Sequence, residues 1–146
     1  MATQHEADEA TIRRQIETLI EALRAQDVEV LGRLYTTDVI SFDVEPPLQH
    51  VGRAAKLTNW AKVFTVFQDV NYEVRDLALA VGAEVAFGHG FGRLSGTLKN
   101  GTTTVGMWVR ATFCFRKIDG AWLIAHDHVS VPLDLRSGKG MTDLEP

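Results

Sequence analysis

The sequence of 146 residues holds one cysteine and no long apolar run. Cys114 cannot form an internal disulfide, and it lies in a strand-like run where a packed thiol is more common than a nucleophile. No stretch approaches the roughly 18 apolar residues of a membrane-spanning helix. The first nine residues are polar and acidic, so we expect no secretory leader. Together these features predict a cytoplasmic protein.

Basic residues are outnumbered by acidic ones. The chain has 15 Lys and Arg against 19 Asp and Glu, a net charge of −4 and a pI near 5.7. This balance argues against nucleic acid or an anionic membrane as the main partner. A phosphate-binding loop, a dinucleotide glycine pattern and a nucleophile elbow are also missing, so we expect no cofactor and no acyl transfer by serine.

The residues that are present suit one domain with a sizeable core, since 45% are hydrophobic. Helical spacing of apolar residues predicts helices over 8–25, around 31–35 and over 52–67, with a short strand over 39–43. Beyond residue 70 the period becomes two, which predicts strands over 71–81, 83–95, 103–118 and 121–132. The expected class is α+β. We expect a single domain over 1–133 and a polar, frayed tail over 134–146.

The stretch 41–52 is the best candidate for a site. Asp43 ends a short apolar run beside the loop of Pro46 and Pro47, and a helix signal follows from Gly52. Asp is depleted in strands and costly to bury. Such a carboxylate is either partly desolvated for proton transfer or a turn residue that binds the loop backbone.

The order of elements resembles the SnoaL-like superfamily, also called nuclear transport factor 2-like. The matching segments are 22–27, 34–39, Asp43 with Gly52, 116–124 and 126–130. The resemblance implies a cone-shaped fold in which three N-terminal helices pack in a curved, mostly antiparallel sheet around a pocket. Members include isomerases, cyclases, hydrolases, dehydratases and non-catalytic modules, so the family alone does not give the reaction.

The ketosteroid isomerases of this superfamily can be compared by spacing. The resemblance places Asp43 at the position of their general base. Leu19 and Thr112 then stand where those enzymes have the tyrosine and the protonated aspartate that hold the oxyanion. The base position is kept and both oxyanion donors are absent, so a different polar set must serve this chain.

Strand alternation from the same anchors predicts which side chains line the pocket. If Thr112 points inward, so do Trp108 and Arg110, while Val109, Ala111, Phe113 and Phe115 point outward. Phe87, His89 and Phe91 are the matching set on the preceding strand, and the resemblance makes Trp60 an aromatic wall. Such apolar walls with few polar groups suit a small apolar molecule.

The last strand has two possible orientations. His126, His128 and Ser130 share one face with Trp122 and Ile124 by simple alternation, whereas Asp127 shares the other with Val129. One bulge would exchange the faces, so both orientations stay open. Polyketide cyclases that resemble this fold use an acid on the last strand, which favours Asp127. Alternating histidines suggest a metal site, but no further convergent ligand is apparent and we expect none.

The leading hypothesis is a cofactor-independent isomerase, cyclase or hydrolase with Asp43 as general base. His89, His126, Asp127 or His128 would relay the proton, while Arg110 and Trp108 would stabilise an oxyanion. The alternative is a non-catalytic binding or dimerisation module, in which Asp43 pairs with Arg110. Half-buried structural histidine and an ion pair across the sheet are the ordinary explanations for His89 and Arg110. The outward apolar sheet face predicts a homodimer.

Overall fold

The computed structural model describes all 146 residues as helices on one side of a curved sheet. Helix α1 (Gln4–Ala25) begins where the Thr3 side chain accepts a hydrogen bond from the backbone N–H of Glu6. It ends at Gln26, which adopts a left-handed conformation with φ 55°. Helix α2 (Val28–Gly32) follows after the capping residue Asp27, and α3 (Arg53–Phe64) begins after Gly52. The three predicted helices are confirmed, with ends shifted by a few residues.

The main sheet has seven strands. Its order is β2 (His50–Val51), β1 (Tyr35–Phe42), β7 (Ala121–Ser130), β6 (Trp108–Ile118), β4 (Val85–Leu98) and β3 (Phe67–Val81), and β5 (Thr103–Thr104) pairs with β4. Only the β1–β7 pair is parallel. The α+β class and the curved sheet are confirmed, and the sheet is open rather than closed. The single strand predicted over 103–118 is two strands, because Gly106 turns the chain with φ 69°.

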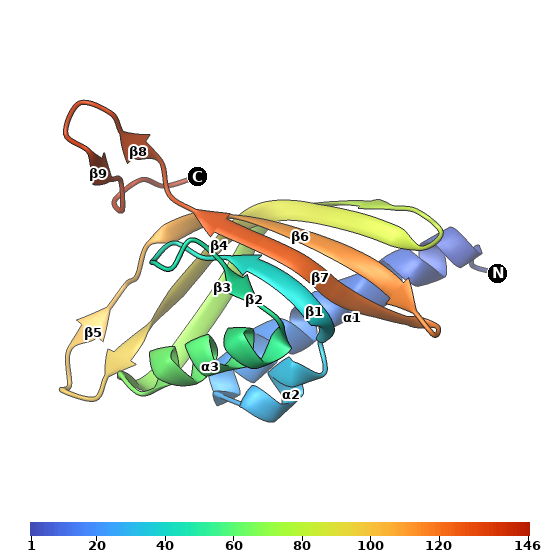
Figure 1. Ribbon diagram of the computed structural model, residues 1–146, viewed down its shortest axis with the longest axis horizontal. Coiled ribbons are helices and arrows are strands. Elements are labelled where there is room, and N and C mark those ends of the chain that lie inside the picture. The colour runs from blue at the N-terminus through green and yellow to red at the C-terminus, as the bar shows by residue number, and fades with distance from the viewer.

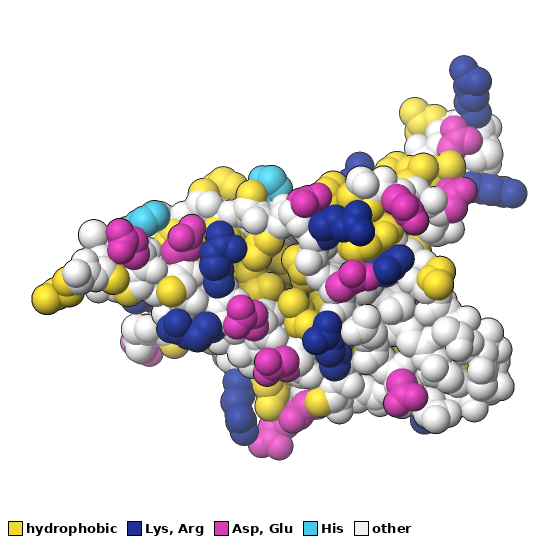
Figure 2. Space-filling model, turned by 180° about the vertical axis from the view of Figure 1, so that it is seen from behind, with side chains coloured by type: hydrophobic (Ala, Val, Ile, Leu, Met, Phe, Trp, Pro, Cys, Tyr) yellow, Lys and Arg dark blue, Asp and Glu magenta, His cyan; other side chains and the backbone are white.

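All three helices pack on one face of the sheet, which we call the inner face. In Figure 1, α2 and α3 lie below the sheet, α1 crosses behind it, and no helix lies above. The core joins apolar residues of α1 to inner-face residues of the strands: Ile12, Ile16, Leu19, Leu23, Tyr35, Val39, Phe113, Phe115, Trp122 and Ile124. Seen from behind, hydrophobic side chains line a hollow that Lys, Arg, Asp and Glu side chains surround (Figure 2).

A bulge decides the orientation of the last strand. The β6–β7 register shifts between Cys114–His126 and Phe115–Ile124, which leaves Ala125 as an extra residue. Because of this insertion, Trp122 and Ile124 face the helices together with Asp127, all three being buried.

The C-terminal segment is ordered. Strands β8 (Leu133–Asp134) and β9 (Lys139–Gly140) form a small hairpin that projects beyond the end of β7 (Figure 1). The Asp134 carboxylate accepts hydrogen bonds from the side chain and backbone N–H of Ser137, and these bonds lower the pKa of Asp134. Within the predicted tail over 134–146, residues 134–140 therefore belong to a hairpin, because the turn supplies its own capping group.

No helix of the chain combines the length and the apolar character needed to cross a membrane.

Candidate functional site

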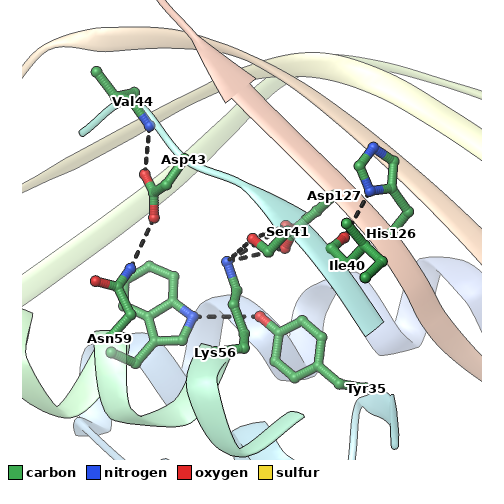
Figure 3. A network of polar contacts seen from close by, with 10 residues as sticks. Tyr35, Ile40, Ser41, Asp43, Val44, Lys56, Asn59, His126 and Asp127 are labelled. Atoms are coloured by element: carbon green, nitrogen blue, oxygen red, sulfur yellow. Dashed lines mark hydrogen bonds and ion pairs between the residues drawn. The ribbon is translucent and has the colours of Figure 1, made fainter. Parts of the chain in front are cut away.

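The candidate site lies between the inner face of β1 and helix α3. Alternation along β1 points Ser41 and Asp43 to the same side, toward the helix (Figure 3). On α3, Lys56, Asn59 and Trp60 share one face, because residues three and four apart are neighbours on a helix. Asp127 reaches the same place from β7. Two strands and one helix therefore position a set of polar groups.

The deepest part of the site is a buried group of three residues. The Nζ atom of Lys56 lies 3.1 Å from Oδ2 of Asp127 and donates a hydrogen bond of 2.9 Å to Oγ of Ser41. Ser41 donates in turn to Oδ1 of Asp127. The exposed fractions are 4% for Lys56, 0% for Ser41 and 6% for Asp127. Each charge is thus compensated inside the protein, as a buried ion pair requires.

Two aromatic side chains complete this buried layer. The Nζ atom of Lys56 lies 5.4 Å from the ring centre of Trp60 and 5.8 Å from that of Tyr35. Nε1 of Trp60 donates a hydrogen bond of 3.3 Å to the hydroxyl of Tyr35. Burial, followed by the negative charge of Asp127, raises the pKa of Tyr35 well above its ordinary value. The phenol therefore stays neutral across the working pH range.

Asp43 lies nearer the surface and has no cationic partner. One carboxylate oxygen accepts a hydrogen bond of 2.7 Å from the backbone N–H of Val44, and the other accepts one of 2.9 Å from the Asn59 amide. The carboxylate is half-buried, and no Lys, Arg or His lies within ion-pair distance. The predicted alternative, a pair between Asp43 and Arg110, is not formed. The two hydrogen bonds fix the orientation of the Asp43 carboxylate, and no cation of the chain neutralises it.

A cavity of about 460 Å³ opens beside Asp43. Phe42, Leu48, Gln49 and His128 form the rest of its lining. The ring of Phe42 meets that of His128 edge to face at 5.4 Å. The cavity thus holds a carboxylate, an imidazole, an amide and two apolar side chains, and its size is that of a small-molecule site.

Most of the other predicted pocket residues lie on the opposite side of the sheet, which we call the outer face. The prediction that Trp108, Arg110 and Thr112 point into the pocket was wrong, because these residues lie on the outer face. Ala111, Phe113 and Phe115, which were predicted to point outward, are buried under the helices. The same correction applies to the preceding strand, where the outer face holds Phe87, His89 and Phe91. The spacing rule assigned the wrong starting face, and alternation then carried the error along both strands.

Several of these outer-face residues line a second cavity, away from Asp43. A second cavity of about 390 Å³ is lined by Asp76, His89, Gly90, Phe91, Arg110, Ala111 and Thr112. Trp108 lies next to it, with the guanidinium carbons of Arg75 and Arg93 at 4.6 and 4.7 Å from its ring centre. These residues are therefore separated from Asp43 by the sheet.

The two histidines of the last strand also belong to the outer face. Nδ1 of His126 lies 2.6 Å from the carbonyl oxygen of Ile40, on the far side of β1 from Ser41 (Figure 3). His128 is exposed and reaches the cavity beside Asp43 from that side. Of the predicted catalytic residues, Asp43 and His128 share a cavity, Asp127 lies deeper on the inner face, and His89 lies elsewhere. No group of three His, Cys, Asp or Glu side chains is arranged to hold a metal ion.

Sequence reasoning missed Ser41, Lys56 and Asn59. Ser41 could have been found, since it alternates with Val39 and Asp43 on one strand face. Lys56 precedes Trp60 by one helical turn and so interrupts the apolar side of α3. A lysine at such a position indicates either a snorkelling side chain or a buried partner. Only the three-dimensional arrangement shows that the partner is Asp127.

Comparison with known proteins gives the family. The sequence model of the SnoaL-like domain matches residues 12–134. The chain belongs to the SnoaL-like family. No curated protein matches it in sequence. Among solved structures, an NTF2-like protein of unknown function from Pseudomonas putida KT2440 is 27% identical, with a TM-score of 0.87 over 96% of this chain and 97% of that one.

Two further solved structures that are similar to this chain carry different assigned activities. A ketosteroid isomerase-like protein from Erwinia carotovora atroseptica is 25% identical, with a TM-score of 0.69 over 83% of this chain and 93% of that one. A candidate dehydratase of the NTF2-like family from Streptomyces avermitilis is 19% identical, with a TM-score of 0.79 over 90% of this chain and 100% of that one. The second likeness shows the fold alone.

Proposed function

We propose that this SnoaL-like protein is a cofactor-independent enzyme that moves a proton on a small, largely apolar substrate, with Asp43 as the general base. One observation carries the proposal. The Asp43 carboxylate is held by Val44 and Asn59 at the wall of an open cavity and is not neutralised by a cation. An oriented, unpaired carboxylate within reach of a bound molecule is what a general base requires.

The surrounding residues have roles that follow from their contacts. The buried ion pair of Lys56 and Asp127 links α3 to β7, and so holds Asn59 in place for its hydrogen bond to Asp43. His128, on another part of the cavity wall, can return the proton, and the Gln49 amide can donate to a developing oxyanion. Arg110 and Trp108 have no part in this scheme, because they lie on the outer face.

The simplest reaction is removal of a proton next to a carbonyl, as in an isomerase or cyclase. The ketosteroid isomerase-like neighbour agrees with this chemistry. A dehydratase would use the same carboxylate to take the proton next to a carbonyl, while the neighbouring hydroxyl leaves as water with a proton from His128, and the candidate dehydratase agrees with this. A hydrolase would use the carboxylate to activate water. Each of these reactions uses Asp43 as the base and needs no cofactor.

Hydrogen exchange in D₂O tests the proposal without knowledge of the natural substrate. A panel of cyclic and aryl ketones is incubated with the protein, and loss of the proton next to the carbonyl is followed by NMR. We expect exchange by the wild type and a loss of roughly 100-fold or more in Asp43→Asn, since a general base contributes about that much. Asp38→Asn is the matched control, because Asp38 lies on β1, the strand that Asp43 follows, and is exposed.

A non-catalytic binding module is the second candidate. It is favoured by the mutual satisfaction of Lys56, Asp127 and Ser41, which leaves no free group in the buried layer. In that case the panel ketones would bind in ligand-observed NMR, yet no hydrogen exchange next to the carbonyl would occur. Equal exchange by wild type and Asp43→Asn would remove Asp43 from its proposed role.

A further inference from the structure

Tyr72 carries a buried hydroxyl group that has no partner in the chain. The residue lies on β3, belongs to the core on the inner face and is 7% exposed. Its backbone carbonyl oxygen accepts a hydrogen bond from Arg24, but its phenol oxygen takes part in none. A buried hydroxyl without a partner costs free energy, and phenylalanine would fill the same space without this cost. The group therefore indicates a partner that is not part of the chain.

The phenol oxygen of Tyr72 borders space that water can enter. Of the buried side-chain oxygens and nitrogens without a partner, only Oγ1 of Thr36 is fully sealed from solvent. The unpartnered oxygen of Tyr72 is thus not sealed. A donor at the edge of accessible space can bind a molecule that enters, whereas a sealed hydroxyl such as that of Thr36 cannot.

Gly92 makes room for this hydroxyl. The side chain of Tyr72 reaches from β3 across β4, and a Cβ atom at position 92 would overlap the hydroxyl oxygen and lie 3.0 Å from the ring carbon Cζ. Glycine in the interior of a strand weakens it and often marks a close approach by another group. Here the approaching group is the phenol, so the strand holds the hydroxyl in a position that any larger residue would deny it.

The inner face between Tyr72 and Asp43 carries small apolar side chains. These belong to β6 and β7, which lie between β4 and β1 in the sheet, and they are Val109, Ala111 and Val129. The two valines remain partly exposed, so the helices do not fill this part of the face. An apolar floor with a carboxylate at one end and a hydroxyl at the other suits a small carbonyl compound.

The phenol of Tyr72 and the carboxylate of Asp43 face a common interior. Burial, followed by the neighbouring Tyr35, raises the pKa of Tyr72 above its ordinary value, so the O–H group remains a donor at working pH. The negative charge of Asp43 contributes to the raised pKa of both phenols. Figure 3 shows Tyr35 and Asp43 on the side of β1 that faces α3.

We propose that Tyr72 is a catalytic residue that donates a hydrogen bond to the carbonyl oxygen of the substrate while Asp43 removes the neighbouring proton. This inference rests on the function proposed above. The proton moves from carbon to the Asp43 carboxylate, and the electron pair of the C–H bond forms the C=C bond of an enolate. The carbonyl π electrons move to the oxygen, which Tyr72 stabilises while keeping its own proton. Tyr72 reaches this oxygen from the interior, whereas Gln49 reaches it from the loop.

The variant Tyr72→Phe removes the hydroxyl and keeps the ring. We expect the exchange of the ketone panel in D₂O to fall by roughly 100-fold or more, as it does when one oxyanion donor is removed. The free energy of unfolding should not fall, because the hydroxyl makes no bond within the chain. Thr36→Val is the matched control, since it also removes a buried hydroxyl without a partner, and it should exchange at the wild-type rate. Equal exchange by Tyr72→Phe and an active wild type would overturn the proposal.

Binding of para-nitrophenol separates this inference from the role of Asp43. The phenol ionises near neutral pH, and its coloured anion imitates the enolate oxygen. We expect Tyr72→Phe to bind the anion about tenfold or more weakly than the wild type, because hydrogen bonds to charged acceptors are the strong ones. Asp43→Asn should bind it at least as tightly as the wild type, since a like charge is removed.

The two experiments fail in different ways. If no ketone exchanges but Tyr72→Phe still binds the anion more weakly, the base has failed and the donor role of Tyr72 stands. If the wild type does not bind the anion, or if Tyr72→Phe binds it equally well, the proposal for Tyr72 is overturned, whatever Asp43 does.

Discussion

Asp43, which directly follows β1, and Asp127, on the neighbouring strand β7, are two carboxylates with opposite surroundings. Asp127 is buried and bound by Lys56 and Ser41. Asp43 is half-buried, receives only neutral donors and borders a cavity. The Asp127 arrangement stabilises the fold, whereas Asp43 remains free to act on a molecule in the cavity. Solvent access and the charge of the partner decide the role, more than the residue type does.

Removing one partner of the buried pair should be costly. We expect Lys56→Met to lower the free energy of unfolding by about 3–5 kcal/mol, because the Asp127 carboxylate remains buried without its cation. The variant Lys56→Met with Asp127→Leu should recover much of this loss, since no charge is left uncompensated. Urea unfolding of both variants and of Asp127→Leu completes the cycle. Additive losses would show that the pair is not coupled as its contacts indicate.

Individual residues could be predicted from the sequence only where a local pattern constrains them. Asp43 could be singled out because Asp is depleted in strands, so an acid at the end of an apolar strand indicates a special role. Asn59 did not, because nothing in a helix sequence tells which exposed or half-buried amide meets a carboxylate 16 positions earlier. Contacts between distant segments depend on the packing of α3 against β1, which only the fold provides.

At the scale of elements, helices and strands followed from periodicity, but strand faces did not. The strong apolar spacing of α1 matches its buried side, which includes Ile12, Ile16 and Leu23. On β6, both alternating sets contain large apolar residues, so alternation alone could not tell inside from outside. On β7, Ala125 is an extra residue at the bulge. The residues that face the helices are therefore Trp122 and Ile124 before it and Asp127 after it, which simple alternation does not give.

A buried carboxylate on helix α1 bonds to two strands of the sheet. Asp8 accepts a hydrogen bond of 3.0 Å from Nε1 of Trp122 and lies 3.1 Å from Nζ of Lys117. The bond from Trp122, with help from Lys117 and Gln4, lowers the pKa of Asp8 below its ordinary value of 3.8. Three elements, α1, β6 and β7, meet at this group.

This arrangement predicts an acid-dependent loss of stability. Because the folded state lowers the pKa of Asp8, its contribution is fully present above the unfolded value of 3.8 and is lost as the pH falls through that value toward the lower folded one. We expect Asp8→Asn to be less stable than the wild type at neutral pH, with a smaller difference at strongly acidic pH. Urea unfolding across this range measures it. A difference independent of pH would contradict the role of the charge.

At the scale of the whole molecule, the layers are unequal. One face of the sheet is covered by three helices, and the other exposes aromatic side chains. The sequence predicted an uncovered apolar face, although it assigned the wrong residues to it. The correct set includes Phe87 and Phe91 in place of Phe113 and Phe115, because the latter pack under the helices.

If a second copy covers the outer face, folding and association are linked, and thermal stability must depend on protein concentration. For a dimer of two such chains, the midpoint of unfolding should rise by roughly 2 °C for each tenfold increase in concentration. Phe87→Asp should unfold at a midpoint independent of concentration, because its charged side chain cannot be buried in an apolar interface. Differential scanning fluorimetry over a wide concentration range measures both. Val66 is similarly exposed and lies off this face, so Val66→Asp is expected to behave as the wild type does. A wild-type midpoint that stays constant would mean that the folded chain is stable without its second copy.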